Sequence, residues 1–209
     1  MYLDVFDRNP YGTNCWLIAA DGADDAVVVD PGFEPAAVHA VLEAAGKVAS
    51  AVLLTHAHVD HAMQAGTFAG DGLPVWIHPA DAVAFRDPDA WAMGSGTPLT
   101  PVKDLRTFED GDVLRLGGGV SVEVLHTPGH TPGSCCFRVE GDAVVFSGDL
   151  VFAGTVGRSD FANSDPGAMQ RSLERFLMLP DELNVLPGHG PRTTVAQERS
   201  SNPFLVGIG

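Results

Sequence analysis

Cysteine is scarce in this sequence. The 209 residues include Cys15, Cys135 and Cys136, and their spacing forms neither a disulfide framework nor a CxxC motif. Cys135 and Cys136 are adjacent, so their side chains would point to opposite faces of a strand. We interpret all three as small, buried, apolar residues.

Basic residues are also few. Lysine and arginine together number 12, against 27 aspartates and glutamates, which gives a formal net charge of −15. Such a chain would repel a phosphate backbone, so nucleic-acid binding is disfavoured. We attribute the acidity to solubility.

Long hydrophobic runs are missing too. No apolar stretch approaches the roughly 20 residues that cross a bilayer, and the N-terminal MYLDVFDRNPYG lacks the basic and apolar segments of a signal peptide. We therefore predict a cytoplasmic protein without membrane association. The hydrophobic share of 45% is that of an ordinary globular protein. The length allows one large domain or two small ones, and we predict a single domain over 1–209.

Strand and helix signals alternate in both halves of the chain. The apolar run VASAVLL (48–54) predicts a strand that is covered on both faces. Residues 34–46 and 165–178 carry apolar positions at helical spacing. Further strands are expected within 14–20, 26–30, 73–78, 112–116, 120–126, 134–140, 142–148 and 182–190, and a last helix over 193–200. Strands and helices mixed in each half predict packed sheets with helices outside them.

One segment lacks this patterning. Residues 86–107, which include Trp91 and Met93, show no clear periodicity. We predict that they form the longest loop of the chain. Long loops often serve as lids or specificity elements, so this loop could shape a binding pocket.

Four polar residues are crowded into one motif after an apolar run. The stretch AVLLTHAHVDHAM (51–63) contains His56, His58, Asp60 and His61, although the chain has only eight histidines. In an extended segment, His56 and His58 point to the same side. If a helix begins near Val59 or Asp60, the direction changes, and Asp60 and His61 could address a second position.

Three further polar residues follow predicted strands in loops that contain glycine. They are His130 in LHTPGHTPGS, Asp149 in VVFSGDL and His189 in VLPGHG. Strand ends hold such groups in place, and glycine lets backbones approach closely. Imidazole and carboxylate suit divalent zinc, iron or manganese. Seven ligands are too many for one tetrahedral ion, so the pattern predicts two ions that share a carboxylate and a water.

The other histidines lack this context. His39, His78 and His126 stand alone in the sequence, without a neighbouring cluster of ligand types. We interpret them as structural residues that are hydrogen-bonded in place.

The motifs resemble those of the metallo-β-lactamase superfamily. THAHVDH matches the family's THxHxDH motif, and PGHTPGS, FSGDLVFAGTVGRSDF and LPGHGPRTTVAQERSSNPF follow in the family's order. The resemblance covers almost the whole chain. It implies an α/β fold, a four-layer αββα sandwich of two β-sheets flanked by helices, with the metal site at one edge between the sheets.

The resemblance also implies roles for the motif residues. Asp149 would bridge the two ions, and Asp30 in VVVDPG would accept a hydrogen bond from a ligand imidazole. Thr55 and Ser134 are weaker candidates for the same kind of support. The first ion would be held by His56, His58 and His130, and the second by Asp60, His61 and His189.

A bridging aspartate is typical of the glyoxalase-II-like branch of the superfamily. The resemblance therefore implies hydrolysis of a small-molecule thioester by a hydroxide that bridges two divalent ions, zinc first, with iron or manganese as alternatives. Asp60 and Asp149 are the acidic residues expected to serve catalysis. Arg158 would meet an anionic group of the substrate or pair with Asp160. Longer glyoxalase II enzymes have a lysine and a tyrosine in that stretch, so the resemblance does not identify the thiol carrier.

Two other activities remain open. Persulfide dioxygenases share the THxHxDH motif and use one iron held by two histidines and an aspartate, which here would be His56, His130 and Asp149. Lactone or β-lactam hydrolysis is a further alternative, because an activated hydroxide tolerates different acyl leaving groups. The sequence does not specify an oligomeric state.

Overall fold

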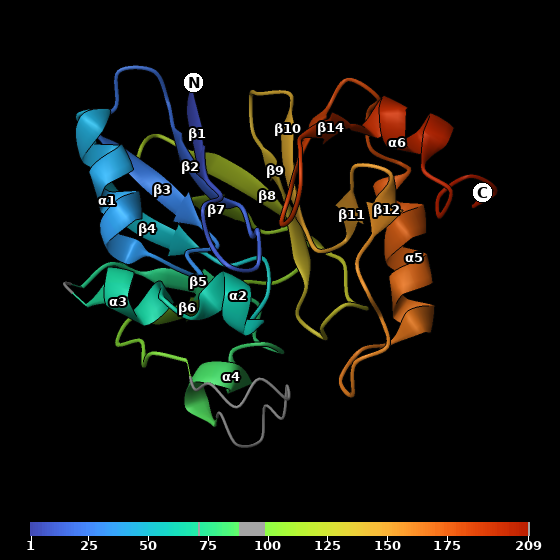
Figure 1. Cartoon of the computed structure of the whole chain (residues 1–209), viewed down its shortest axis with the longest axis horizontal. Coiled ribbons are helices and arrows are strands. Elements are labelled where there is room, and N and C mark those ends of the chain that lie inside the picture. Colours follow the sequence, from blue (N-terminus) through green and yellow to red (C-terminus); the bar gives the residue numbers. More distant parts are fainter. Residues whose placement is uncertain (71, 88–98, 209) are drawn as a thin grey trace.

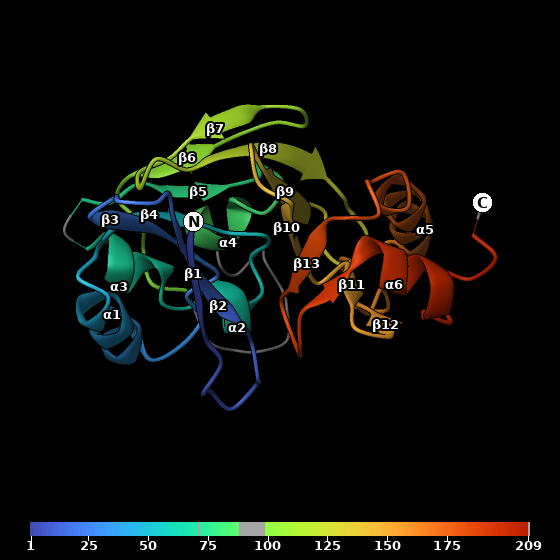
Figure 2. The ribbon, with the colours of Figure 1, turned by 90° about the horizontal axis from the view of Figure 1, so that it is seen from above.

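Two β-sheets lie face to face with helices on the outside of both. The computed structural model describes residues 1–70, 72–87 and 99–208. Figure 1 shows α1 and α3 on the outer side of one sheet and α5 and α6 beside the other, at the opposite side of the molecule. Figure 2 shows the same layers from above. The predicted α/β sandwich of two sheets flanked by helices is confirmed.

The first sheet has the strand order β1-β2-β3-β4-β5-β6. Strands β1 to β3 pair antiparallel, whereas β3 to β6 run parallel. Carboxyl ends of parallel strands meet at one edge of a sheet, so the residues after β3, β4 and β5 gather there. The strands are β1 Tyr2–Phe6, β2 Cys15–Ala19, β3 Asp25–Val29, β4 Val48–Leu53, β5 Val75–Ile77 and β6 Leu105–Thr107.

The second sheet has the strand order β14-β13-β10-β9-β8-β7. Only β10 and β13 pair in parallel among the described strands of this sheet. A small hairpin, β11 with β12, follows β10. The strands are β7 Val113–Arg115, β8 Ser121–His126, β9 Cys135–Val139, β10 Val144–Gly148, β11 Val151–Phe152, β12 Thr155–Val156, β13 Asn184–Pro187 and β14 Thr193–Thr194.

The helices begin and end where local signals dictate. Pro35 occupies the first turn of α1, and Gly46 follows its end with a φ of +69°. The Asp165 carboxylate accepts hydrogen bonds from Gly167 N and Ala168 N and so caps α5. The helices are α1 Pro35–Ala44, α2 Val59–Ala62, α3 Ala65–Ala69, α4 Val83–Arg86, α5 Pro166–Phe176 and α6 Val195–Ser201. None of these described helices has the length and apolarity needed to cross a membrane.

The apolar strands are explained by burial on both faces. In β3, Val27 and Val29 pack between the two sheets, whereas Val28 packs against the outer helices. A third cluster, which includes Met169 and Phe176, lies between the second sheet and α5. Because side chains alternate along a strand, a strand covered on both sides is apolar throughout.

The predicted long loop 86–107 is wrong at both ends. Arg86 closes α4, and residues 105–107 form β6. Among the described strands, β6 pairs with β5 alone and lies at the edge of its sheet. Two of its three residues are exposed, and the third, Leu105, is apolar. Trp91 and Met93 lie outside the described residues.

Candidate metal centre

The HAHVDH segment changes direction as its sequence predicts. His56 and His58 follow β4, and His58 is still extended, with φ −61° and ψ 145°. Helix α2 then begins at Val59, so Asp60 and His61 project from a helical turn. One short segment therefore presents two pairs of side chains to two positions.

The structure brings all seven predicted ligands together. They fall into three overlapping groups, and within each group the ligand atoms lie within 4.8 Å of one another. His61 and His56 each belong to two groups. The groups are His56, His58 and His130; His56, His61 and Asp149; and Asp60, His61 and His189.

Three nitrogen atoms of the first group lack a hydrogen bond. The Nε2 atoms of His56, His58 and His130 are buried and make no hydrogen bond within the described part of the chain. Leaving a buried polar atom unpaired is costly, and such atoms call for an explanation. A divalent ion is the group that three converging imidazole nitrogens fit, so these residues suit a metal.

In His56 and His130 the opposite ring nitrogen, Nδ1, makes a hydrogen bond. Thr55 Oγ1 donates to Asp30 Oδ2 at 2.7 Å, which leaves its oxygen to accept from His56 Nδ1 at 3.0 Å. His130 Nδ1 donates to the carbonyl oxygen of Arg158 at 2.7 Å. With Nδ1 protonated, the Nε2 lone pair of His56 and His130 is free to face a metal.

Asp30 contacts the ligand His61 directly and the ligand His56 through Thr55. Its Oδ2 lies 3.0 Å from His61 Nδ1, and its Oδ1 accepts from Thr55 N at 2.8 Å. The backbone of Asp30 is left-handed, with φ 55°, a conformation that aspartate and asparagine tolerate better than most residues. The aspartate is therefore held in an uncommon geometry that directs its carboxylate at the ligand loop.

Asp149 lies between the two ends of the site. Its Oδ2 is 3.4 Å from His130 Nε2 and 3.5 Å from His189 Nε2, and its Oδ1 is 3.3 Å from His61 Nε2. At the far end, His189 Nε2 is 3.2 Å from Asp60 Oδ2. One carboxylate thus adjoins histidines of both ends, which is the arrangement that a bridging ligand requires.

The pKa values of the histidines differ between the two ends of the site. Burial, reinforced by His61 and His58, holds the pKa of His56 well below its usual range, and burial with His130 lowers the pKa of His58 to about 3. Burial would lower the pKa of His189 as well, but the adjoining aspartates outweigh it and raise the pKa to about 9. The first end therefore offers neutral imidazoles, which is the form that binds metals.

Glycine makes this close packing possible. A Cβ on Gly188 would lie 2.2 Å from Asp149 Oδ1, and one on Gly32 would lie 1.6 Å from the Asp60 carbonyl oxygen. Neither position accepts a side chain without moving a ligand residue. The close approach explains why the predicted ligand loop VLPGHG has glycine at position 188.

Arg158 lies at the rim of the site. Its side chain is 67% exposed and pairs with Asp160 at 2.9 Å, which is one of the two roles expected from the sequence. The guanidinium also lies 4.6 Å from the centre of the Phe161 ring, which in turn adjoins the His58 ring at 5.3 Å. Arg158 is thus connected to the site through Phe161.

Two residues near the site escape the sequence analysis. Thr13 Oγ1 donates to Asp60 Oδ2 at 3.1 Å, and the buried Asp81 accepts hydrogen bonds from the loops on both sides of the first group. Asp81 follows β5, just as the predicted ligands follow other strands. That signal could have drawn attention to it. Ser134, a weaker candidate, contacts Thr131 rather than a ligand imidazole.

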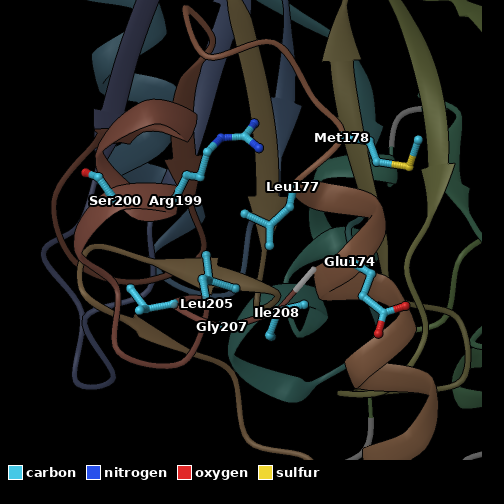
Figure 3. A pocket seen from close by; sticks show the side chains of 9 residues that line it. Glu174, Leu177, Met178, Arg199, Ser200, Leu205, Gly207 and Ile208 are labelled. Atoms are coloured by element: carbon cyan, nitrogen blue, oxygen red, sulfur yellow. The ribbon is translucent and has the colours of Figure 1, made fainter.

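The other three histidines lie outside the groups of candidate ligands. His39 stacks on Phe68 with ring centres 4.6 Å apart, and His78 stacks on His126 at 3.9 Å. A separate hollow of about 500 Å³ lies between α5, α6 and the C-terminal residues. Its side chains, which include Leu177, Arg199 and Leu205, come from none of the ligand loops (Figure 3).

Comparisons with known proteins show relatives in sequence and in fold. Hydroxyacylglutathione hydrolase GloC of Haemophilus influenzae is 34% identical over 98% of both chains. Among solved structures, BLEG-1, a B3 metallo-beta-lactamase, gives a TM-score of 0.89 at 33% identity and covers 99% of this chain and 100% of its own. TTHA1623 in a di-iron-bound form gives 0.83 at 39% identity, with 98% and 100% covered.

A further solved structure, ETHE1 from Myxococcus xanthus, gives a TM-score of 0.80 at 26% identity, covering 99% of this chain and 85% of its own. Residues 8–189, which span every predicted ligand, match the family model of the metallo-beta-lactamase superfamily. With two facing sheets and a histidine–aspartate cluster at their edge, the chain belongs to the metallo-β-lactamase superfamily.

Proposed function

We propose that this protein is a dinuclear metal-dependent hydrolase of small-molecule thioesters. The position of Asp149, within 3.5 Å of histidines at both ends of the site, carries the proposal. The unpaired Nε2 atoms of His56 and His58 add neutral ligands at one end. The ligands of the first ion would be His56, His58, His130 and Asp149, and those of the second Asp60, His61, His189 and Asp149.

Two divalent ions, when bound, supply Lewis acidity and lower the pKa of a shared water towards about 7. The chain supplies orientation. Asp149 holds the midpoint of the site, and Asp60 is itself held by Thr13. Because a thiolate leaves readily, the chain needs no proton donor for the leaving group. The Phe161 ring beside His58 provides an apolar wall on which Arg158 stacks.

The thioester class is supported by the name of the relative GloC, a hydroxyacylglutathione hydrolase. Zinc is our first choice of metal, and iron is the alternative that the di-iron form of TTHA1623 favours. β-Lactam hydrolysis is a candidate side activity because BLEG-1 is described as a B3 metallo-beta-lactamase.

The first experiment is elemental analysis of protein purified without chelators or a metal-binding tag. About two ions per chain are expected, together with hydrolysis of acyl thioesters in a panel that varies the thiol carrier. Penicillin and lactone substrates serve as comparison compounds. One ion per chain, or a loaded protein inert towards every thioester, would contradict the proposal.

The second candidate is a persulfide dioxygenase with a single iron, which His56, His130 and Asp149 would hold. The similarity to ETHE1 favours it. This activity would be favoured over the hydrolase by two results together. The protein would contain one iron per chain and bind no further ion when soaked in zinc or manganese, and it would take up oxygen in the presence of a persulfide.

A further inference from the structure

Asp81 is a buried carboxylate that is not one of the proposed ligands. It lies in HPADAV, just after β5, and its exposed fraction is 0%. A carboxylate removed from water requires hydrogen-bond donors or a counter-charge. The donors around Asp81 therefore show which parts of the fold depend on it.

The donors come from two different loops. Oδ2 accepts from Ala57 N at 2.9 Å and from Thr131 Oγ1 at 2.8 Å, and Oδ1 accepts from Gly133 N at 2.7 Å. Ala57 lies between His56 and His58, whereas Thr131 directly follows His130. One carboxylate thus joins the loop after β4 in the first sheet to the loop between β8 and β9 in the second.

The junction is tightly packed. A Cβ on Gly133 would lie 2.6 Å from Asp81 Oδ1, so the loop comes closer than a side chain would allow. Ser134 Oγ accepts from Thr131 N at 3.0 Å and lies 2.8 Å from Thr131 Oγ1, which helps to orient that hydroxyl. Little freedom remains for one loop to move relative to the other.

The three histidines meet across this junction. The His130 ring lies 4.8 Å from the His56 ring and 4.4 Å from the His58 ring, both nearly perpendicular. Two of the rings come from one loop and the third from the other. Metal affinity depends on ligand positions held within about 0.5 Å, so the spacing of the two loops matters directly.

We propose that Asp81 is a positioning residue for the three-histidine group, and that its carboxylate sets the distance between the His56–His58 loop and His130. The inference rests on the proposed metal site, although Asp81 itself touches neither metal nor substrate. Its role differs from that of Asp30, which contacts the imidazole of His61 directly and is hydrogen-bonded to the hydroxyl of Thr55.

The test is Asp81→Asn, measured in a His189→Ala background so that the other end lacks a ligand. Asparagine keeps the size of the side chain but turns one acceptor into a donor, which must then face Gly133 N or Ala57 N. The affinity for Co²⁺ alone, measured by chelator competition and by the visible spectrum, should fall about 10- to 100-fold.

Glu198→Gln is the matched control. Glu198 is also buried and accepts from Gly154 N, Thr193 Oγ1 and Asn202 Nδ2, none of which lies in the two loops that carry His56, His58 and His130. Its loss should lower thermal stability and leave the Co²⁺ affinity unchanged. An equal loss of affinity in both variants would mean that Asp81 acts only through general stability, and would overturn the inference.

Amide hydrogen exchange in the metal-free protein gives a second readout. In Asp81→Asn, exchange at Ala57 and Gly133 should accelerate selectively, and Thr131→Val, which removes one of the three donors, should show a smaller effect. Unchanged exchange at both amides would overturn the inference. If the protein with Asp81 intact binds no Co²⁺, the proposed function fails, and the exchange data alone decide the role of Asp81.

Discussion

The chain holds two sets of imidazole rings that serve different purposes. In the stacked pair, the backbone uses the ring nitrogens: His78 Nδ1 accepts from Ala80 N at 3.3 Å, and His126 Nε2 donates to Pro132 O at 2.9 Å. In the candidate metal centre, by contrast, His56 Nε2 and His58 Nε2 have no hydrogen-bond partner within the described residues. The candidate ligands of the first group are therefore distinguished from the stacked pair by buried Nε2 atoms without a hydrogen bond.

The acidic neighbours differ as well. Asp149 adjoins three of the centre's histidines, with no described arginine or lysine paired to it. Beside the stacked pair, Asp110 is already paired with Arg175 at 2.7 Å, and Glu109 is 3.9 Å from His78 and largely exposed. Imidazole nitrogens without a hydrogen bond, and a buried carboxylate that adjoins histidines only, together mark the site for cations.

Removal of a first-group ligand should produce the largest effect. In His58→Ala the three-histidine group loses a nitrogen, and we expect thioester hydrolysis to fall by about 1,000-fold or more, because a bound Lewis acid lowers the barrier by several kcal/mol. The metal content should drop while the circular dichroism stays that of the folded sandwich. His39→Ala, on a ring that stacks on Phe68, is the control. A His58→Ala protein with full activity and full metal content would refute the ligand assignment.

Asp30→Asn tests support of the ligands rather than ligation. The amide keeps the volume and tolerates the left-handed backbone, so folding should be preserved. It cannot accept from both His61 Nδ1 and the Thr55 hydroxyl and amide as the carboxylate does. We expect metal affinity to fall about 10- to 100-fold, measured by chelator competition. Unaltered affinity would show that the imidazoles do not need this acceptor.

Much of the fold was predictable because its buried strands carry their own signature. VASAVLL and AVVVD are mostly apolar because much of each strand is covered on both faces, and they overlap β4 and β3. Edge strands carry no such signature. In the part of the chain that the structure describes, β6 and β14 each pair with a single neighbour, and their residues are largely polar, so neither stands out from a loop.

The candidate site was predictable for a related reason. Its seven residues follow strands, and the topology gathers strand ends at one edge. Asp81 also follows a strand, but its segment HPADAV lacks the glycine that is found in the loops of His130, Asp149 and His189. Its contacts to Ala57 and Gly133 depend on how two sheets pack, which neighbouring residues in the sequence do not encode.

The stacked pair should respond to acid without affecting metals. Burial, then the neighbouring His126, lower the pKa of His78 to about 4, against the weaker opposite effect of Asp110. Its neutral form therefore contributes stability that is complete above pH 6.5 and lost as the pH falls to 4. The variant His78→Phe keeps a ring against His126 but cannot be protonated there. Between pH 6.5 and pH 4, its free energy of unfolding should therefore decrease less than that of the wild type, by on the order of 2 kcal/mol.

Chemical unfolding of the metal-free protein at several pH values measures this difference. Metal content and thioester hydrolysis should match the wild type, because His78 belongs to no group of candidate ligands. Parallel stability curves would show that the pair does not resist protonation. Loss of metal in His78→Phe would break the distinction between the two sets of imidazoles.

Arg158 should give the smallest effect, because its side chain is exposed and already paired with Asp160. Exposed ion pairs are weak, so Arg158→Ala should raise KM for an anionic thioester by about two- to fivefold at most, with kcat unchanged. Asp160→Asn, which frees the guanidinium, should lower KM, and both shifts should disappear at high salt. If both variants leave KM unchanged and only reduce thermal stability, Arg158 is a structural partner of Asp160 and Phe161, and the anionic end of the substrate is bound elsewhere.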